Sequence, residues 1–244
     1  MKANTGMKMI PLQGEAFGKP MVINPTLLWD DDRAVLVDTG MPGSWETIRQ
    51  EMNRAGVPLE RLQAIILTHQ DLDHIGSLPE IVRELGGQVE IYAHELDQPY
   101  IEGTRPLLKA NPKIMAPILA MLPEKEREHL QRLCENPPKA MVHKTLADAE
   151  ILPYCGGIRI IHTPGHTPGH ISLYVEDSKT LIAGDAMVYM NEALRGPIPQ
   201  NTLDMEIAVN SLKKFENLEI NSIICYHGGM CQNNVQEQLY ALIR

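Results

Sequence analysis

Residues 67–76, LTHQDLDHIG, place two histidines and two aspartates within six positions. The run AIIL (64–67) before them is apolar and β-branched, as in a buried strand, and SLPEIVREL (77–85) after them has a helical pattern. The four polar groups therefore fall on a loop between a strand and a helix. Ligands of open α/β sheets bind at the carboxyl ends of strands, so we expect this loop at a functional site.

The four side chains on this loop are the imidazoles and carboxylates of His69, Asp71, Asp73 and His74. These groups suit zinc, iron or manganese. One loop that offers four of them can hold two metal ions that share a substrate. A helix cap with two solvated histidines is the alternative interpretation. That alternative suits a single H-x-D pattern better than this set of four.

Three further strand-like runs end in residues of the same kinds. His166 lies in IIHTPGHTPGH, Asp185 follows TLIAG, and His227 follows IICY. Each pattern alone is typical of a turn, but together they predict one metal site assembled across a sheet edge. The neighbouring His162 and His170 are expected to support ligands or to lie at the surface.

In this order the motifs resemble those of the metallo-β-lactamase-fold hydrolases. HQDLDH stands in place of the family's H-x-H-x-D-H loop, while PGHTPGH, GD and YHGG supply its later histidine, its bridging aspartate and its last histidine. VLVDTG (35–40) resembles an early family element around Asp38. The matches run from about residue 34 to residue 228. The resemblance implies an α/β fold, a four-layer αββα sandwich with the metals at one edge of its two sheets.

The resemblance also implies two divalent metal ions held by seven side chains. The ligands of the first ion would be His69, Asp71 and His166. The ligands of the second ion would be Asp73, His74 and His227, and Asp185 would bridge the two ions.

Asp71 departs from the family pattern, which has histidine at this position. A carboxylate adds negative charge and is a harder ligand than imidazole, so it should weaken the preference for zinc relative to iron or manganese. The diiron flavoproteins of the same fold carry a glutamate here. Zinc, or else iron or manganese, therefore remain the candidate metals.

A metal-bound hydroxide between the two ions would attack the carbonyl of an ester, lactone or thioester. Asp73 is expected to orient this nucleophile and receive its proton, and Asp38 and Thr68 to steady ligand histidines. Tyr189 stands four residues after Asp185 and resembles the tyrosine that assists ring opening in acyl-homoserine lactonases. It is predicted as a donor to the oxyanion, with buried packing as the alternative.

Two other functional classes stay open beside the hydrolase. An iron site with open positions would suit an oxygenase or redox protein, although no appended flavin domain is visible. The same fold with weak catalysis would suit a ligand-binding regulatory protein.

Residues 95–147 are repeatedly broken by proline and carry apolar helical pieces, so they are predicted as a helical insertion within a single domain of residues 1–244. A long connection in a compact domain is usually functional. The apolar face with Met115 and Leu119 would form plain core, a wall over the metals for an apolar acyl part of the substrate, or a homodimer surface.

Charge and hydropathy limit the partners. The net charge is −9 and the chain has no long run of lysine or arginine, which disfavours nucleic acid. No segment is apolar for long enough to be a signal peptide or a membrane span. The expectation is a cytoplasmic enzyme that acts on a small molecule.

Overall fold

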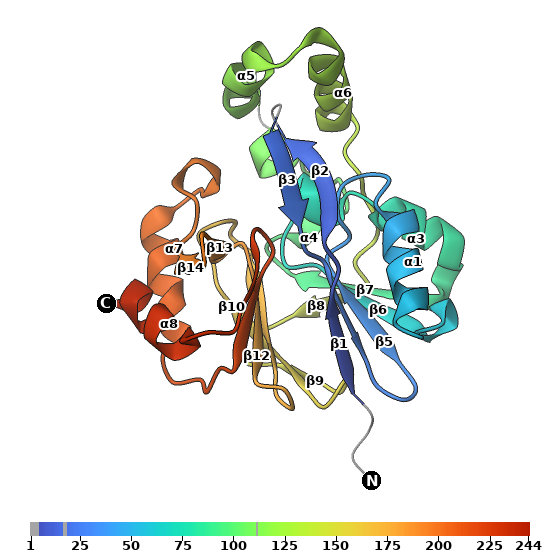
Figure 1. The fold of residues 1–244 in the computed structure, drawn as a ribbon. Coiled ribbons are helices and arrows are strands. Elements are labelled where there is room, and N and C mark those ends of the chain that lie inside the picture. Colours follow the sequence, from blue (N-terminus) through green and yellow to red (C-terminus); the bar gives the residue numbers. More distant parts are fainter. Residues whose placement is uncertain (1–4, 17–18, 111) are drawn as a thin grey trace.

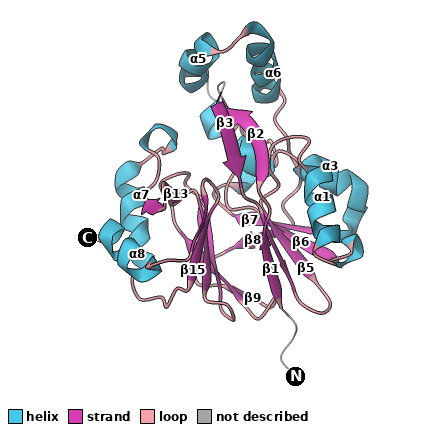
Figure 2. Cartoon of the chain, in the orientation of Figure 1, coloured by secondary structure: helices cyan, strands magenta, loops and turns pink. Residues whose placement is uncertain are grey.

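Two six-stranded sheets lie side by side at the centre of the molecule (Figures 1 and 2). The computed structural model describes residues 5–16, 19–110 and 112–244. The strand order of the first sheet is β1 (Gly6–Met9), β4 (Thr26–Trp29), β5 (Ala34–Val37), β6 (Leu62–Ile66), β7 (Glu90–His94) and β8 (Lys144–Leu146). The pairs β5–β6, β6–β7 and β7–β8 are parallel. The pairs β1–β4 and β4–β5 are antiparallel.

The strand order of the second sheet is β16 (Gly229–Cys231), β15 (Ser222–Cys225), β12 (Thr180–Gly184), β11 (Ile171–Val175), β10 (Ile158–His162) and β9 (Ile151–Leu152). Its only parallel pair among the described residues is β12 with β15. Two hairpins lie apart from the sheets: β2 (Leu12–Ala16) with β3 (Lys19–Ile23), and β13 (Val188–Met190) with β14 (Ala193–Arg195).

Helices cover the outer face of each sheet, which gives four layers (Figure 1). The first sheet is covered by α1 (Trp45–Arg54) and α3 (Leu78–Leu85), and the second by α7 (Met205–Ser211) and α8 (Val235–Ile243). Short helical turns occur at α2 (Leu72–Ile75), η1 (Leu59–Arg61), η2 (Gly86–Gln88), η4 (Pro199–Asn201) and η5 (Leu212–Phe215).

Alternation along the strands explains this layering. On β5, Leu36 belongs to the apolar cluster under α1 and α3, while Val35 and Val37 belong to the cluster between the sheets. Successive strand side chains point to opposite faces, and both faces of β5 are buried. Each such side chain contributes about 1.5–3 kcal/mol by leaving water. A strand that is apolar throughout therefore needs a layer on each side.

The apolar run MVINPTLLW (21–29) predicts one strand and the pattern of CQNNVQEQLYALIR (231–244) predicts one helix, but both elements have different bounds in the structure. The strand predicted at 21–29 is two strands, β3 and β4, because Pro25 offers no N–H to a ladder and Asn24 donates its amide to the Tyr226 carbonyl instead. The helix predicted at 231–244 starts only at Val235, because Cys231 pairs with Ile223 as the last residue of β16.

The connection between β7 and β8 carries α4 (Gln98–Ile101), η3 (Leu108–Ala110), α5 (Pro112–Met121) and α6 (Glu124–Glu135). In Figure 1, α5 and α6 stand above the sheets, next to the β2–β3 hairpin. Within the described ranges, no helix combines the length and the apolar character that crossing a bilayer requires.

Candidate metal centre

Loops after four strands bring the predicted ligands together at one end of the sandwich. The loop after β6 and the start of α2 carry four of them, and the ends of β10, β12 and β15 are each followed by one. Three groups of potential ligand atoms result, each within 4.8 Å. Together these groups contain all seven side chains: His69, Asp71, Asp73, His74, His166, Asp185 and His227.

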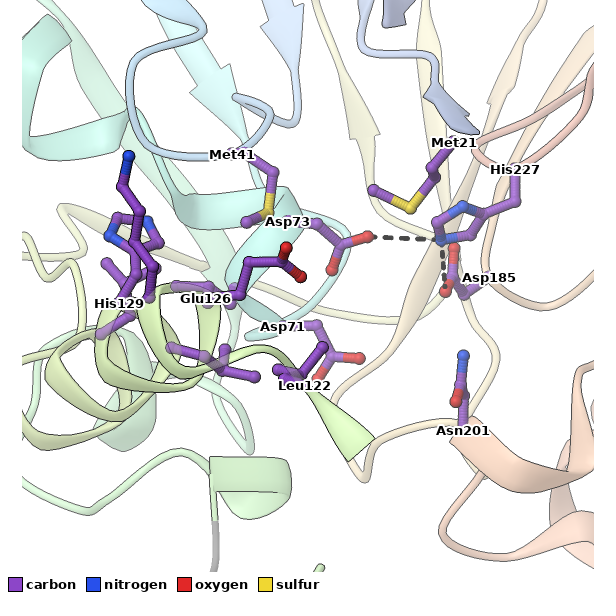
Figure 3. Close-up of a pocket in the computed structure, with 14 residues that line it drawn as sticks. Met21, Met41, Asp71, Asp73, Leu122, Glu126, His129, Asp185, Asn201 and His227 are labelled. Atoms are coloured by element: carbon purple, nitrogen blue, oxygen red, sulfur yellow. Dashed lines mark ion pairs between the residues drawn. The ribbon is translucent and has the colours of Figure 1, made fainter. Parts of the chain in front are cut away.

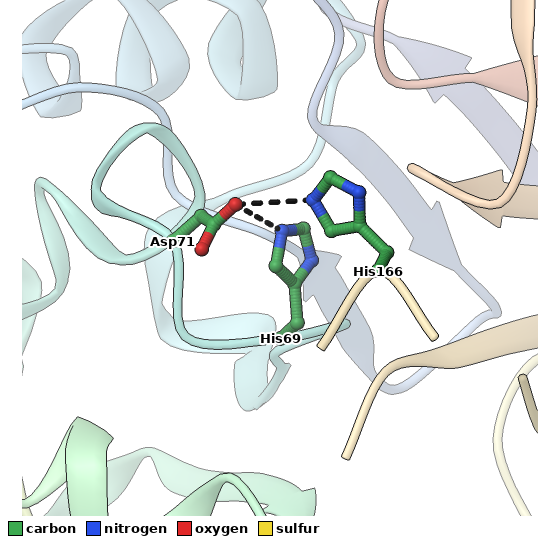
Figure 4. Close-up of side chains that lie close together, drawn as sticks. All are labelled: His69, Asp71 and His166. Carbon is green, nitrogen blue, oxygen red and sulfur yellow. Dashed lines mark hydrogen bonds and ion pairs between the residues drawn. The ribbon is translucent and has the colours of Figure 1, made fainter. Parts of the chain in front are cut away.

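The first group is His69, Asp71 and His166 (Figure 4). Asp71 Oδ2 lies 3.2 Å from His69 Nε2 and 3.1 Å from His166 Nε2. Both histidines are buried. Two imidazole nitrogens and one carboxylate oxygen thus face a common point.

The second group is Asp73, His74 and His227. Asp73 Oδ2 lies 3.3 Å from His227 Nε2 and 3.8 Å from His74 Nε2. Figure 3 shows His227 between the carboxylates of Asp73 and Asp185.

Asp185 lies between the two groups. Its Oδ2 is 3.3 Å from His166 Nε2 and 3.4 Å from His227 Nε2, and its Oδ1 is 3.4 Å from His74 Nε2. A carboxylate that faces ligands of both groups has the geometry of a bridge.

Asp38 and Thr68 fix the orientation of two ligand histidines, as predicted. Asp38 accepts the Thr68 N–H and the Thr68 hydroxyl, each at 2.8 Å, and its Oδ2 lies 2.9 Å from His74 Nδ1. Because the Thr68 proton goes to Asp38, the Thr68 oxygen accepts from His69 Nδ1, 3.0 Å away. Both imidazoles therefore donate through Nδ1, so that in the neutral ring Nε2 carries the lone pair that a metal needs.

His170 supports the bridging aspartate. Its Nε2 accepts the backbone N–H of Asp185 at 3.0 Å, and its Nδ1 lies 2.8 Å from the Thr163 hydroxyl. Gly184 makes this approach possible, because a Cβ there would lie 2.7 Å from His170 Nε2 and its φ is +55°. His162 stacks on His94 instead, with ring centroids 4.0 Å apart.

Two supporting residues were not predicted from the sequence. Buried Asp97 accepts from the Gln70 N–H, the Thr167 hydroxyl and the Gly169 N–H at 2.8–3.0 Å, so it joins the two ligand loops. Tyr226 stacks on His74 at 3.7 Å and donates its hydroxyl to the Asp73 carbonyl. The position of Tyr226 next to His227 in YHGG was an available signal, and Asp97 lies in YAHELD (92–97) just after β7.

Tyr189 does not have the placement that a catalytic role requires. Its side chain packs against the apolar cluster under α8 that contains Cys225 and Cys231. It is not among the residues that line the cavity over the metal ligands. Its backbone N–H donates to the His227 carbonyl, 3.1 Å away. The placement of Tyr189 thus matches the packing alternative and not the predicted oxyanion donor.

The ligand cluster fits a divalent metal ion. His69 Nε2, His74 Nε2 and Asp185 Oδ1 are buried and have no hydrogen-bond partner among the described residues. Buried polar atoms are normally paired, and these three all face the same cluster. Imidazole and carboxylate donors around a shared point are the ligands of zinc, iron and manganese sites.

The charges of the cluster depend strongly on one another. Burial lowers the pKa of His69 to about 4, aided by the neighbouring His74. For His227, burial acts in the same direction, but the carboxylates of Asp185 and Asp73 outweigh it and raise the pKa to about 10. Asp38, Asp73 and Asp185 likewise raise the pKa of buried His74 well above its usual value. Without a metal, protons on His74 and His227 therefore balance the carboxylates.

Metal binding should release protons. A ligand histidine must lose its proton to bind a metal, and His227 with a pKa of about 10 is protonated at neutral pH. Metal affinity should therefore rise with pH toward about 10 and fall as the pH is lowered. Calorimetric metal titration in buffers of different ionisation enthalpy would show release of at least one proton per chain. A heat that does not depend on the buffer would contradict this charge assignment. His227→Gln should release fewer protons than the unaltered protein.

A cavity of about 600 Å³ opens onto the cluster (Figure 3). Asp71, Asp73, Asp185 and His227 form its floor. The remaining lining residues come from β3, α2, α6, η4 and two loops, and they are mainly apolar: Met21, Met41, Leu72, Leu122, Lys125, Glu126, His129, Leu130, Leu133 and Asn201.

Known proteins resemble the chain over most of its length. The metallo-beta-lactamase superfamily model matches residues 18–227. The probable metallo-hydrolase YflN of Bacillus subtilis (strain 168) is 32% identical over 205 residues, 80% of this chain and 75% of YflN. Hydroxyacylglutathione hydrolase GloC of Haemophilus influenzae is 28% identical over 212 residues, 84% of this chain and 85% of GloC.

A solved structure gives the same result for the fold. A metallo-beta-lactamase family protein from Thermus thermophilus superimposes with a TM-score of 0.72 at 22% identity, over 98% of this chain and 78% of that one. The predicted four-layer α/β sandwich is thereby confirmed.

Proposed function

Because the chain belongs to the metallo-β-lactamase superfamily, we propose that it is a metal-dependent hydrolase of an ester, lactone or thioester with an apolar acyl part. The observation that carries this proposal is the apolar cavity whose floor is the cluster of ligand carboxylates and histidines. A substrate in the cavity would present its carbonyl directly to that cluster.

Two divalent metal ions, when bound, would lower the pKa of a coordinated water and polarise the acyl carbonyl. His69, Asp71 and His166 would hold one ion, and Asp73, His74 and His227 the other. Asp185, which faces both groups, would bridge them. The metal itself is zinc, iron or manganese, and the carboxylate of Asp71 in place of the usual histidine favours a harder ion than zinc.

Asp73 is the residue best placed to handle the proton of the attacking water. Burial raises the pKa of its carboxyl, but His74 and His227 outweigh burial and hold that pKa below its usual value, so Asp73 is ionised at neutral pH. Its carboxylate also borders the cavity. It would accept a hydrogen bond from the water and then take up the proton.

The rest of the chain orients these groups and shapes the substrate. Asp38, Thr68 and His170 hold ligands from behind, and Asp97 joins the two ligand loops. Leu130 and Leu133 of α6 supply apolar wall to the cavity. The similarity to GloC, a hydroxyacylglutathione hydrolase, supports hydrolysis of an acyl group.

The test of the proposal is a substrate panel on protein freed of metal and then loaded with zinc, manganese or iron(II). Short- and long-chain esters, lactones and thioesters would be compared for each metal. The proposal expects turnover that requires added metal and is abolished by a chelator. Absence of turnover with every metal and carbonyl class would contradict it.

The insertion is expected to set the preferred chain length, through α6 and not through the α5 residues predicted from the sequence. Met115 and Leu119 are not among the cavity-lining residues, whereas Leu130 and Leu133 are. Leu130→Ala and Leu133→Ala should lower kcat/KM for long-chain esters more than for acetyl esters, since each buried methylene contributes about 0.8 kcal/mol.

Met121→Ala is the matched control for this measurement, because Met121 is 83% exposed at the end of α5. It should leave both chain lengths unaffected. Equal losses on short and long chains in the α6 variants would remove the wall from the proposal.

A further inference from the structure

Lys109 of the insertion reaches into the first ligand group. Its ammonium lies 2.5 Å from Asp71 Oδ2 and 2.6 Å from His166 Nε2. Its side chain is only 20% exposed. A lysine that interacts with two candidate metal ligands at once does not behave as an ordinary surface cation.

The backbone around Lys109 is anchored to the ligand loop. Buried Gln70, which lies between His69 and Asp71, accepts the Leu108 N–H through Oε1 at 2.8 Å. The preceding Leu107 is buried in the core under the first sheet. The η3 turn is therefore held next to the cluster, and the lysine side chain starts from a fixed position.

The hydrogen bonds of His166 show which of its ring nitrogens accepts a hydrogen bond from the ammonium of Lys109. Thr202 donates its hydroxyl to the Ile198 carbonyl at 2.8 Å, so it accepts from His166 Nδ1 at 3.5 Å. His166 Nε2 then carries a lone pair. This lone pair accepts from the ammonium of Lys109, although it is also the lone pair that a metal would need.

The first metal and the ammonium of Lys109 thus require the same two acceptor atoms. A carboxylate at Asp71, in place of the family's neutral histidine, adds one negative charge, and Lys109 supplies one positive charge to match it. The second group differs, because within the described residues the ion-pair partners of Asp73 include no lysine. They are His74 and His227, which lose their protons and become ligands themselves when a metal binds.

We propose that Lys109 acts as an internal cation in the first metal position, so that the first metal must displace it and binds more weakly than the second. The inference rests on the two-metal site of the proposed function. Like charges repel strongly at a partly buried site, so a bound metal would drive the ammonium toward the cavity. The two sites would fill in sequence, the Asp73–His74–His227 site first.

Lys109→Met tests this inference by removing the charge and keeping most of the side-chain volume. Competition titration against a chromophoric chelator should give two affinities in the unaltered protein. The weaker affinity should improve about ten-fold or more in Lys109→Met. Lys139→Met, which alters an exposed lysine of the same insertion, should change neither affinity. Lys109→Gln is the second neutral variant and should behave in the same way.

Thermal unfolding supplies a readout that does not depend on activity. In chelator, Lys109→Met should melt at a lower temperature than the unaltered protein, because the charge of Asp71 loses its partner. In saturating metal the difference should disappear. Combination with Asp71→His should reduce the effect of Lys109→Met on the weaker affinity, as a double-mutant cycle would report.

If the weaker of the two affinities, that of the first metal, is unchanged or falls further in Lys109→Met, the inference is overturned and the two-metal site stays in place. If the unaltered protein binds no metal at all, the proposed function itself fails.

Discussion

Changing Asp73 to asparagine should lower kcat/KM of the metal-loaded protein by about a thousand-fold. The amide keeps the shape of the side chain and an oxygen toward the metal, but it cannot take a proton from the attacking water. Asp73 borders the cavity, and its carboxylate lies 3.3 Å from the Nε2 of His227 within the ligand cluster. Rates should be compared at equal metal content, measured on the same samples.

Asp32→Asn is the control for this substitution, since Asp32 is exposed on the turn between β4 and β5. It should retain full activity. If Asp73→Asn keeps its metal and more than about a tenth of the rate, the proton is handled elsewhere, because a positioned base typically contributes 10²–10⁴-fold.

Asp38→Asn should weaken metal binding by about 10- to 100-fold, although residue 38 itself contacts no metal. Asp38 receives hydrogen bonds from the Thr68 N–H, the Thr68 hydroxyl and His74 Nδ1. An amide cannot accept all three, so His74 loses its orientation, and a buried donor without a partner costs about 1–3 kcal/mol. Asparagine tolerates the positive φ of 61° at this position, so backbone strain should not add to the loss.

Metal affinity by chelator competition and melting temperature in chelator would separate these two effects. Asp204→Asn is the matched control, since the side chain of Asp204 caps α7 by accepting the Ile207 N–H. Its metal affinity should equal that of the unaltered protein. Equal affinity in Asp38→Asn would mean that His74 does not depend on Asp38 for its orientation.

The ligand set could be predicted because its positions are local features of the sequence. Each ligand follows an apolar strand by at most eight residues, and these strands end at the same side of the sheets. Glycine marks the crowded points, as at Gly184, where a Cβ would approach His170. The pattern therefore reports both the fold and the convergence of the seven side chains.

The supporting contacts could not be predicted. They join residues that are distant in the chain, and whether two such side chains meet depends on the side-chain conformations in the folded protein. Lys109 meets His166 across 57 positions, and Asp97 meets Gly169 across 72. The insertion shows the same limit: its helical character was apparent, but the periodicity did not reveal that α6, and not the face with Met115 and Leu119, would border the cavity.

The error at Tyr189 has a related cause. Spacing from Asp185 suggested a neighbour of the metals, but the direction of a side chain depends on its strand register. Tyr189 pairs with Leu194 in the β13–β14 hairpin and packs against the cluster under α8. A position four residues from a ligand therefore lies on the far side of the second sheet.

The most direct test of the two-metal centre is anomalous X-ray diffraction from crystals of the protein saturated with a single metal. We predict two peaks about 3.5–4 Å apart, one against His69, Asp71 and His166 and the other against Asp73, His74 and His227, with Asp185 in contact with both. No peak at the cluster, or a single peak that persists at saturating metal, would contradict a two-metal centre.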